Sequence, residues 1–342
     1  MQRKVRVGII GCGRILPMHI VPATILEEAE LAAVCDIKAD RAQKAAKKYH
    51  VKAYTDYKEM LAKERLDAVH VCIPHYLHPI VSAYALSQGV NVLSEKPMSI
   101  DYESGLRCVE LAERLDLQYG VILQCRYNKS SQLVKKALND GRLGKIISAR
   151  STLTWTRPDS YYAESDWKGT WDKEGGGVII DQAIHSMDLV NWFIQDDPVK
   201  VDISMANRGH KQVFVEDSAE GLITYRNGVR YGFYCMNNYG CDEPIEIRLY
   251  CEKGKAVLTY DDACIQYNDG TTETVVETGS DIEYEGGKDY WGFQHIKQIR
   301  QFYRSVLGLE SLEISGREAL KIQHLICAMY ESGKTKKPVY FE

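Results

Sequence analysis

The chain has 342 residues, of which 45% are hydrophobic and 26% are charged, with a formal net charge of −4. This length suits two domains, and the mixed charge without a basic block excludes the surfaces typical of nucleic-acid-binding and membrane-binding proteins. The N-terminal MQRKVRVGIIG leads directly into a strand, and no apolar run resembles a signal peptide or spans a bilayer. Its ten cysteines are scattered without a CxxC pair, so we expect a reducing, cytoplasmic location.

Buried strands alternate with amphipathic helices in the first third of the chain. The expected strands are residues 5–10, 31–36, 68–73, 91–95 and 118–124, and the expected helices are residues 39–50, 56–64, 76–89 and 101–116. Asp40 and Asp101 are expected as N-caps. This alternation predicts an α/β domain with a doubly wound parallel Rossmann sheet over residues 1–125, which binds its ligand at the carboxyl ends of the strands.

The turn GCGRIL follows the first strand. Gly11 suits a tight turn, and Gly13 allows a pyrophosphate to approach the backbone at the start of a helix, while Leu16 replaces the third glycine of the dinucleotide motif. Asp36 ends the second strand and either accepts hydrogen bonds from the adenosine ribose or caps the next helix. A carboxylate there repels a 2′-phosphate, so we expect NAD rather than NADP.

From about Asn128 the pattern changes to longer, partly alternating strands. The expected strands include residues 146–156, 219–228, 229–237, 245–253 and 255–261, with a hairpin turn at Arg226–Gly228. This pattern predicts that residues 126–342 form an α+β domain with a large open mixed sheet, mostly antiparallel. Too few helical segments remain to cover both faces of the sheet, so we expect a homodimer or homotetramer formed through it.

Residues 157–174 are polar and aromatic with little periodicity, which predicts a loop. Aromatic rings stack on sugar faces and charged side chains bond hydroxyl groups, so Arg157, Trp167 and Trp171 are candidates for substrate recognition. The two tryptophans equally suit a second interpretation, as packed anchors of the loop.

The stretch GGGVIIDQAIH, which begins at Gly175, sets Asp181 and His185 four residues apart, on one face of an expected helix. His185 suits the general base that removes a hydroxyl proton. Asp181 either orients the imidazole or binds a substrate hydroxyl. Without other evidence, the two residues equally form a local pair that stabilises the helix.

Four motifs together resemble the Gfo/Idh/MocA oxidoreductases, the glucose–fructose oxidoreductase and inositol dehydrogenase group. These motifs are GIIGCGR, CIPHYLHP, SEKPMS and GGGVIIDQAIH, and the resemblance extends to the C-terminal ALKIQHLICAMYESGKTKKPV. It implies a nucleotide-binding domain, a second domain whose open sheet forms the oligomer contact, and an active site between domains. The closing helix and tail are expected to pack back on the first domain.

The resemblance also implies site residues. Lys96, Asp181 and His185 match the family's catalytic lysine and the pair that faces it. The residues assigned to the cofactor site are Gly11, Cys12, Gly13, Arg14, Ile15, Asp36, Arg41, Ile73, Pro74, His75, His78, Glu95, Lys96 and Gln124. His75 and Gln124 stand where asparagine is usual. The residues assigned to substrate binding are Lys96, Arg126, Tyr127, Arg157, Trp167, Trp171, Asp181 and His185.

These features predict a dehydrogenase that transfers hydride from a ring secondary alcohol of a sugar, glycoside, nucleotide sugar or inositol to NAD. The alternatives are a redox-neutral glycoside hydrolase or epimerase on the same scaffold, and a non-catalytic regulator that binds the cofactor. Glu, His and Cys do not cluster at ligand spacing, so we expect no metal. Five other histidines show no comparable partner in the sequence and are expected to be structural or exposed; they are His19, His50, His210, His295 and His324.

Overall fold

A computed structural model describes residues 3–260, 262–277, 282, 284–287 and 292–341. The chain divides into two compact units, Met1–Gln124 with Ser280–Lys321, and Cys125–Gly279 with Ile322–Glu342. This division differs from the expected ranges 1–125 and 126–342, because a late segment returns to the first unit. The helix of this segment, His295–Val306, packs on the helix Leu16–Ile25 through apolar residues that include Ile299 and Phe302.

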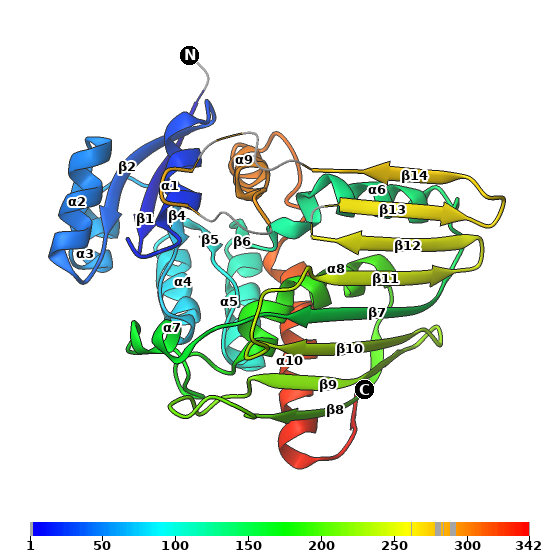
Figure 1. The fold of residues 1–342 in the computed structure, drawn as a ribbon. Helices are drawn as coiled ribbons and strands as arrows, with labels where there is room; N and C mark the ends of the chain where they lie inside the picture. The colour runs from blue at the N-terminus through cyan, green and yellow to red at the C-terminus, as the bar shows by residue number, and fades with distance from the viewer. Residues whose placement is uncertain (1–2, 261, 278–281, 283, 288–291, 342) are drawn as a thin grey trace. The chain divides into compact units, whose positions relative to one another are not determined.

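The first unit contains the expected Rossmann sheet of parallel strands (Figure 1). In sheet order its strands are β3 (Lys52–Tyr54), β2 (Ala29–Cys35), β1 (Val5–Ile10), β4 (Ala68–Val71), β5 (Asn91–Ser94) and β6 (Tyr119–Val121). The short β3, which the sequence pattern missed, has three residues, of which Lys52 and Ala53 are exposed. The strand order reverses between β1 and β4, the point at which sheets of this type bind ligands.

The helices of the first unit are α1 (Leu16–Ile25), α2 (Ala39–Tyr49), α3 (Tyr57–Lys63), α4 (His78–Ser87), α5 (Tyr102–Arg114) and α9 (His295–Val306), with the 3₁₀ turn η1 (His75–Leu77). Four of these helices, α2 to α5, follow the expected segments closely, whereas α9 was not expected from the sequence. Asp101 is confirmed as an N-cap, since its carboxylate accepts a hydrogen bond from Ser104 N. The prediction that Asp40 is an N-cap is wrong, because α2 begins at Ala39 and Asp40 lies inside its first turn.

The second unit contains a nine-stranded sheet. In sheet order its strands are β14 (Thr272–Val275), β13 (Asp262–Tyr267), β12 (Gly254–Thr259), β11 (Glu246–Cys251), β7 (Ile146–Thr154), β10 (Arg230–Met236), β9 (Ser218–Tyr225), β8 (Pro198–Ala206) and β15 (Val339–Tyr340). All neighbours are antiparallel except β10 and β7, which confirms the mixed, mostly antiparallel sheet. The expected hairpin turn joins β9 to β10, with Gly228 at φ +87°.

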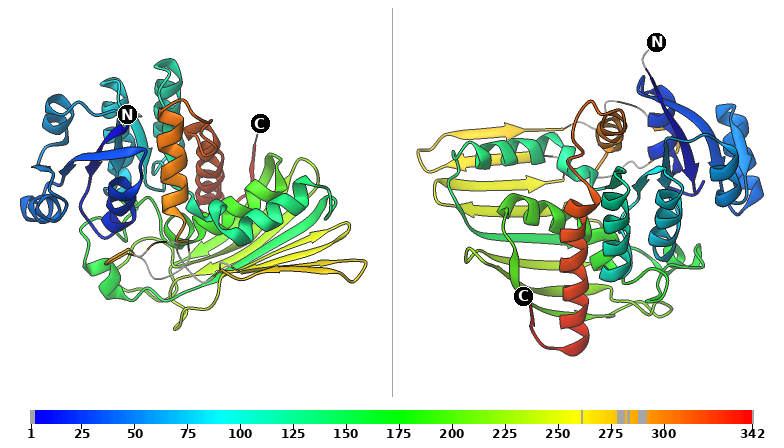
Figure 2. Two further views of the ribbon diagram at one scale, coloured as in Figure 1. Left: turned by 90° about the horizontal axis from the view of Figure 1, so that it is seen from above. Right: turned by 180° about the vertical axis from the view of Figure 1, so that it is seen from behind.

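The second unit's helices gather on one face of this sheet (Figure 2). They are α6 (Lys129–Asn139), the short α7 (Asp159–Ala163) within the expected loop, a π-helical turn η3 (Ile179–Ala183), α8 (Ile184–Ile194) and the second half of α10 (Gly316–Thr335). α6 packs on β13 and α8 on β7. On the opposite face, Leu222 and Tyr250 are 40% and 39% exposed. Among the described residues, no helix is long and apolar enough to cross a membrane.

Candidate active site

The turn after β1 has the geometry that a bound dinucleotide requires. Gly11 has φ +103°, and a Cβ there would lie 2.1 Å from Cys72 O, so only glycine fits. A Cβ on Gly13 would meet no atom within 4 Å, which leaves open space above the backbone. The helix α1 starts after Ile15 without a side-chain cap. This turn therefore fits a pyrophosphate at the start of α1.

Asp36 combines the two roles that the sequence left open. It lies just after β2 and is 9% exposed. Its Oδ2 accepts a hydrogen bond from Cys12 N at 2.8 Å, which ties it to the glycine turn, and its Oδ1 accepts one from Lys38 N, the N-cap residue of α2. A carboxylate has about four acceptor sites. Two remain for a ribose, so the geometry fits NAD.

The other residues assigned to the cofactor lie around the same strand ends. Arg14 and Ile15 precede α1, Ile73 and Pro74 join β4 to η1, and Arg41 is exposed on α2.

His75 begins η1, and Gln124 is 1% exposed at the start of the 3₁₀ turn η2 (Gln124–Tyr127). Both ring nitrogens of His78 face backbone carbonyls, those of Pro97 and Ile73, each at 2.7 Å. Backbone carbonyl groups thus bind the His78 imidazole, and this side chain connects the loops after β4 and β5.

Glu95 lies at the centre of a buried histidine cluster that the sequence did not reveal. Its Oε1 is 2.9 Å from His19 Nε2 and 3.5 Å from His295 Nε2. His19 Nδ1 contacts His70 Nδ1, and His70 Nε2 contacts the hydroxyl of Tyr303, each at 3.0 Å. His19 and His295 are thus structural, as expected, and their partners could not be read from the sequence because residues far apart in the chain meet in space.

The histidines of this cluster stabilise a buried anion. Burial raises the pKa of the Glu95 carboxyl, but hydrogen bonds from His19 and His295 outweigh burial and hold that pKa well below its usual value. His19, Glu95 and His295 also meet the spacing of metal ligands, contrary to the expectation from sequence. Their short contacts already form a hydrogen-bonded network, and the second oxygen of Glu95 accepts a hydrogen bond from Lys96 N at 3.1 Å. Glu95 thus anchors the backbone of the candidate catalytic lysine.

In the second unit, the glycine run is required by close packing. Gly175 has φ +88°, which favours glycine. A Cβ on Gly176 would lie 1.9 Å from the Tyr330 hydroxyl, and one on Gly177 would lie 1.9 Å from Glu216 O. The chain then enters η3, not the expected continuous α-helix: Asp181 lies in the π turn and His185 in α8. Single π turns occur often at functional sites.

Asp181 accepts hydrogen bonds from side chains that the sequence did not identify. Its Oδ2 accepts hydrogen bonds from Tyr161 at 3.0 Å, from Lys168 Nζ at 2.9 Å and from Gln182 Nε2 at 2.7 Å. Lys168 also contacts the Tyr161 hydroxyl at 2.6 Å and Glu174 at 3.5 Å. The only signal for this lysine was its place in the WKGTW run beside the predicted tryptophans.

This cluster keeps a positive charge at a half-buried position. Burial lowers the pKa of the Lys168 ammonium, but Asp181, Tyr161 and Glu174 together raise it well above its usual value. Burial also raises the pKa of the Glu174 carboxyl, to about 8. The cation Lys168 therefore stabilises Asp181 as an anion. His185, 7% exposed, follows four residues later.

Arg126 and Arg157, assigned to substrate binding, are engaged within the second unit. Arg126 is 4% exposed, and its Nε and Nη2 donate to Asp188 at 2.8 and 2.6 Å, so it holds η2 against α8. Tyr127 is half-buried in the same turn. Arg157 packs over the Trp155 ring and bonds Asp242 at 3.2 Å.

The two assigned tryptophans differ in their surroundings. Trp171 donates to Phe214 O at 2.8 Å and packs edge-on against Tyr330, which supports the anchor interpretation. Trp167 lies 5.0 Å from Lys168 Nζ and is half-buried. The assignment of Trp167 to substrate binding stays a prediction.

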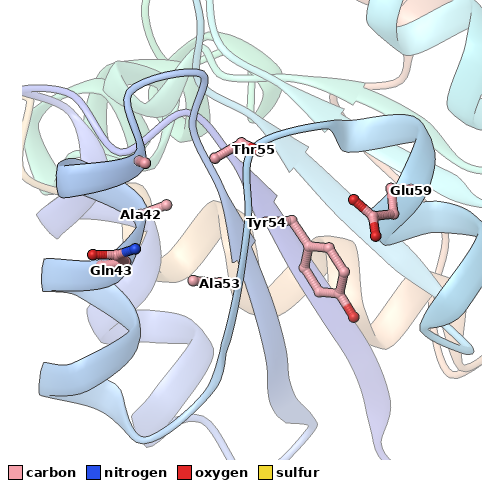
Figure 3. A pocket seen from close by; sticks show the side chains of 7 residues that line it. Ala42, Gln43, Ala53, Tyr54, Thr55 and Glu59 are labelled. Carbon is pink, nitrogen blue, oxygen red and sulfur yellow. The ribbon is translucent and has the colours of Figure 1, made fainter.

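Two cavities among the described residues share no residue with the sites above. One, of about 180 Å³, lies between α2, β3 and α3 (Figure 3) and is lined by Ala39, Ala42, Gln43, Ala53, Tyr54, Thr55 and Glu59. The other, of about 720 Å³, lies between α6 and β14. Neither gathers groups suited to the expected chemistry.

Comparison with known proteins places both parts of the chain. Residues 5–123 match the model of an oxidoreductase family with an NAD-binding Rossmann fold, and residues 131–257 match the GFO/IDH/MocA C-terminal domain. Among curated relatives, myo-inositol 2-dehydrogenase of Thermotoga maritima is 24% identical and aligns over 98% of both chains. D-glucoside 3-dehydrogenase of Escherichia coli is 26% identical over 96% of this chain and 95% of that protein.

A solved structure is similar over the same length. The WlbA dehydrogenase from Bordetella pertussis, in complex with NADH and UDP-GlcNAcA, has a TM-score of 0.85 and 28% identity, and the match covers 99% of each chain. Its similarity extends over both units, each of which thus has a counterpart in that enzyme.

Proposed function

The chain belongs to the Gfo/Idh/MocA oxidoreductase family, and we propose that it is an NAD-dependent dehydrogenase that oxidises a ring secondary alcohol of a sugar, glycoside, nucleotide sugar or cyclitol. The observation that carries this proposal is that Asp181, which lies four residues before His185, forms an ion pair with half-buried Lys168. An ionised carboxylate and an imidazole on one helical segment are the groups that alcohol oxidation requires.

The proposed chemistry divides among three residues. His185 accepts the hydroxyl proton, and Asp181, kept anionic by Lys168, stabilises the imidazolium that forms. Lys96 supplies a positive charge to the developing alkoxide. General base catalysis contributes about 10²–10⁴-fold. When bound, the nicotinamide accepts the hydride from the carbinol carbon.

The relatives support the substrate class. Their names describe dehydrogenases of myo-inositol and of a D-glucoside, and the solved dehydrogenase carries a nucleotide sugar. All three are rings with secondary hydroxyl groups. We therefore propose a ring polyol or its glycoside as the substrate.

The test mixes the protein with NAD and a panel of inositols, monosaccharides, glycosides and UDP-sugars, and follows the absorbance of reduced nicotinamide. We expect net reduction of NAD with at least one ring alcohol. Turnover of a substrate without net NADH would instead establish the redox-neutral hydrolase or epimerase. Absence of any turnover over the whole panel, with NAD bound, would contradict the proposal.

We also propose that the protein forms a homodimer or homotetramer through the uncovered face of its large sheet. The exposed Leu222 and Tyr250 on that face support this arrangement. A cytoplasmic location is proposed as well, because Cys35 and Cys72 are buried thiols rather than disulfides.

A further inference from the structure

The backbone that leads into the catalytic helix is held by two side chains from elsewhere in the second unit. The first four N–H groups of a helix have no partner within it. At this helix start, the backbone N–H groups of Gly177 and Ile179 donate to the two carboxylate oxygens of Glu216, at 2.9 and 3.1 Å. Val178 N donates to the backbone oxygen of Glu216, and Ile180 N to the Tyr330 hydroxyl, each at 3.2 Å.

Glu216 and Tyr330 also bind each other. The Tyr330 hydroxyl donates to Glu216 Oε1 at 2.9 Å. Tyr330 is 6% exposed and Glu216 is 3% exposed. Gly176 packs against that hydroxyl and Gly177 against the Glu216 backbone, too closely for any Cβ. We call this arrangement the Glu216–Tyr330 socket. It joins the loop before β9 and helix α10 to the turn that carries Asp181.

Two features of the socket act in opposite directions on the charge of the Glu216 carboxylate. Aligned N–H groups at a helix start favour an anion. Burial disfavours it and raises the pKa of Glu216 to about 7. Among the described residues, the titratable groups that face Glu216 are Tyr330 on α10, Glu174 before the glycines and Cys235 on β10. None of the three is a cation that would fix the charge of Glu216.

We propose that Glu216 and Tyr330 are positioning residues: ionised Glu216 holds the turn from Gly177 to Ile180, and through it sets Asp181 and His185 in their working geometry. An anionic Glu216 accepts from every donor that faces it. A protonated Glu216 carries a hydrogen on one oxygen and has lost its negative charge, so one of the two N–H groups faces a weaker acceptor and the turn loosens. The catalytic pair is then active only when this third group, which does not touch the substrate, is ionised. This inference rests on the proposed function.

The decisive variant is Glu216→Gln, which keeps the shape but turns an NH₂ donor toward an N–H donor. We expect kcat to fall by about 10- to 100-fold, while the Kd of NADH, a property of the first unit, stays unchanged. Glu220→Gln on β9 is the matched control, since this carboxylate lies at the surface near Arg208. Unchanged kinetics of the Glu216 variant would overturn the proposal.

Two readouts separate positioning from a general structural role. The pH dependence of kcat in the native enzyme should contain, beside the contribution of the base His185, a second ionisation that disappears in Glu216→Gln and persists in Glu220→Gln. Amide hydrogen exchange of residues 177–180 should be faster in Glu216→Gln and in Tyr330→Phe, but not in Tyr340→Phe, whose side chain is exposed. Equal exchange in these three variants would contradict the socket. Because exchange needs no substrate, failure of the proposed dehydrogenase activity leaves this test intact.

Discussion

The ammonium of Lys168 lies 2.9 Å from Asp181 Oδ2. We therefore expect Lys168→Met, which removes this cation, to slow turnover. Loss of a hydrogen bond to a charged partner costs about 1.5–3 kcal/mol, and each ~1.4 kcal/mol is tenfold in rate. We expect kcat to fall by about 10- to 100-fold. Lys173→Met serves as control, because Lys173 Nζ donates to the backbone oxygen of Asp166 rather than to Asp181. Equal turnover of the native enzyme and Lys168→Met would exclude a role for this cation.

Asp36 determines the expected preference for NAD. Asp36→Ser removes the charge that repels a 2′-phosphate and weakens the contact with Cys12 N. Fluorescence titration should show weaker NADH binding and a smaller preference over NADPH. Asp40→Ser, an exposed change on α2, should leave both affinities unchanged. A native enzyme that binds NADPH as tightly as NADH would contradict this interpretation.

At the scale of elements, Gly177 is fixed by the backbone oxygen of Glu216. A Cβ at Gly177 would lie 1.9 Å from that oxygen, so Gly177→Ala must displace the turn. Overpacking costs about 1–3 kcal/mol, which lowers Tm by about 2–4 °C per kcal/mol in a unit of this size. The control is Gly232→Ala on β10, where the nearest atom is 4.0 Å away. A thermal scan that finds the same Tm for both variants would refute this account of the glycines.

Most elements of the first unit were predictable because each depends on its own pattern; the short β3 and the late helix α9 were the exceptions. Apolar strands, helical spacing and the Asp101 cap are local features. The sites were only partly predictable, because long-range packing completes them. Asp181 and His185 could be named from spacing, but Lys168, Glu216 and Tyr330 meet them only in the fold. The π turn also escaped prediction, since it arises from tertiary contacts at the glycines rather than from helix propensity.

At the scale of the whole molecule, the two units should respond to pH with opposite sign. In the first unit, burial holds the pKa of His70 well below 6.5, and the histidine contacts hold that of Glu95 below 4.5. The unfolded chain then binds more protons, so this unit loses stability as pH falls below about 6.5.

In the second unit, burial raises the pKa of Glu216 to about 7 and that of Glu174 to about 8. The folded state then binds more protons than the unfolded chain, so stability falls as pH rises from about 4.5 to about 8. Hydrogen exchange at about pH 5.5 and about pH 8, corrected for intrinsic rates, should show opposite trends in the two units. The same trend in both would contradict these assignments.

The uncovered sheet face should determine assembly. Leu222→Asp combined with Tyr250→Asp places two charges on that face, where they would be buried without partners in an oligomer. Light scattering should show a homodimer or homotetramer for the native protein and a smaller species for the double variant. Asp substitutions at the exposed Ile37 and Ile80 of the first unit provide the control. A native monomer would rule out the proposed assembly.

The most direct test of the central claim follows the hydrogen that leaves the alcohol. A substrate that carries deuterium on its carbinol carbon is incubated with the protein and NAD, and both products are analysed by mass spectrometry. We predict deuterium in the reduced nicotinamide and an oxidised ring, with almost complete loss of transfer in His185→Asn. Deuterium that returns to the sugar without net NADH, or full transfer by His185→Asn, would contradict the account.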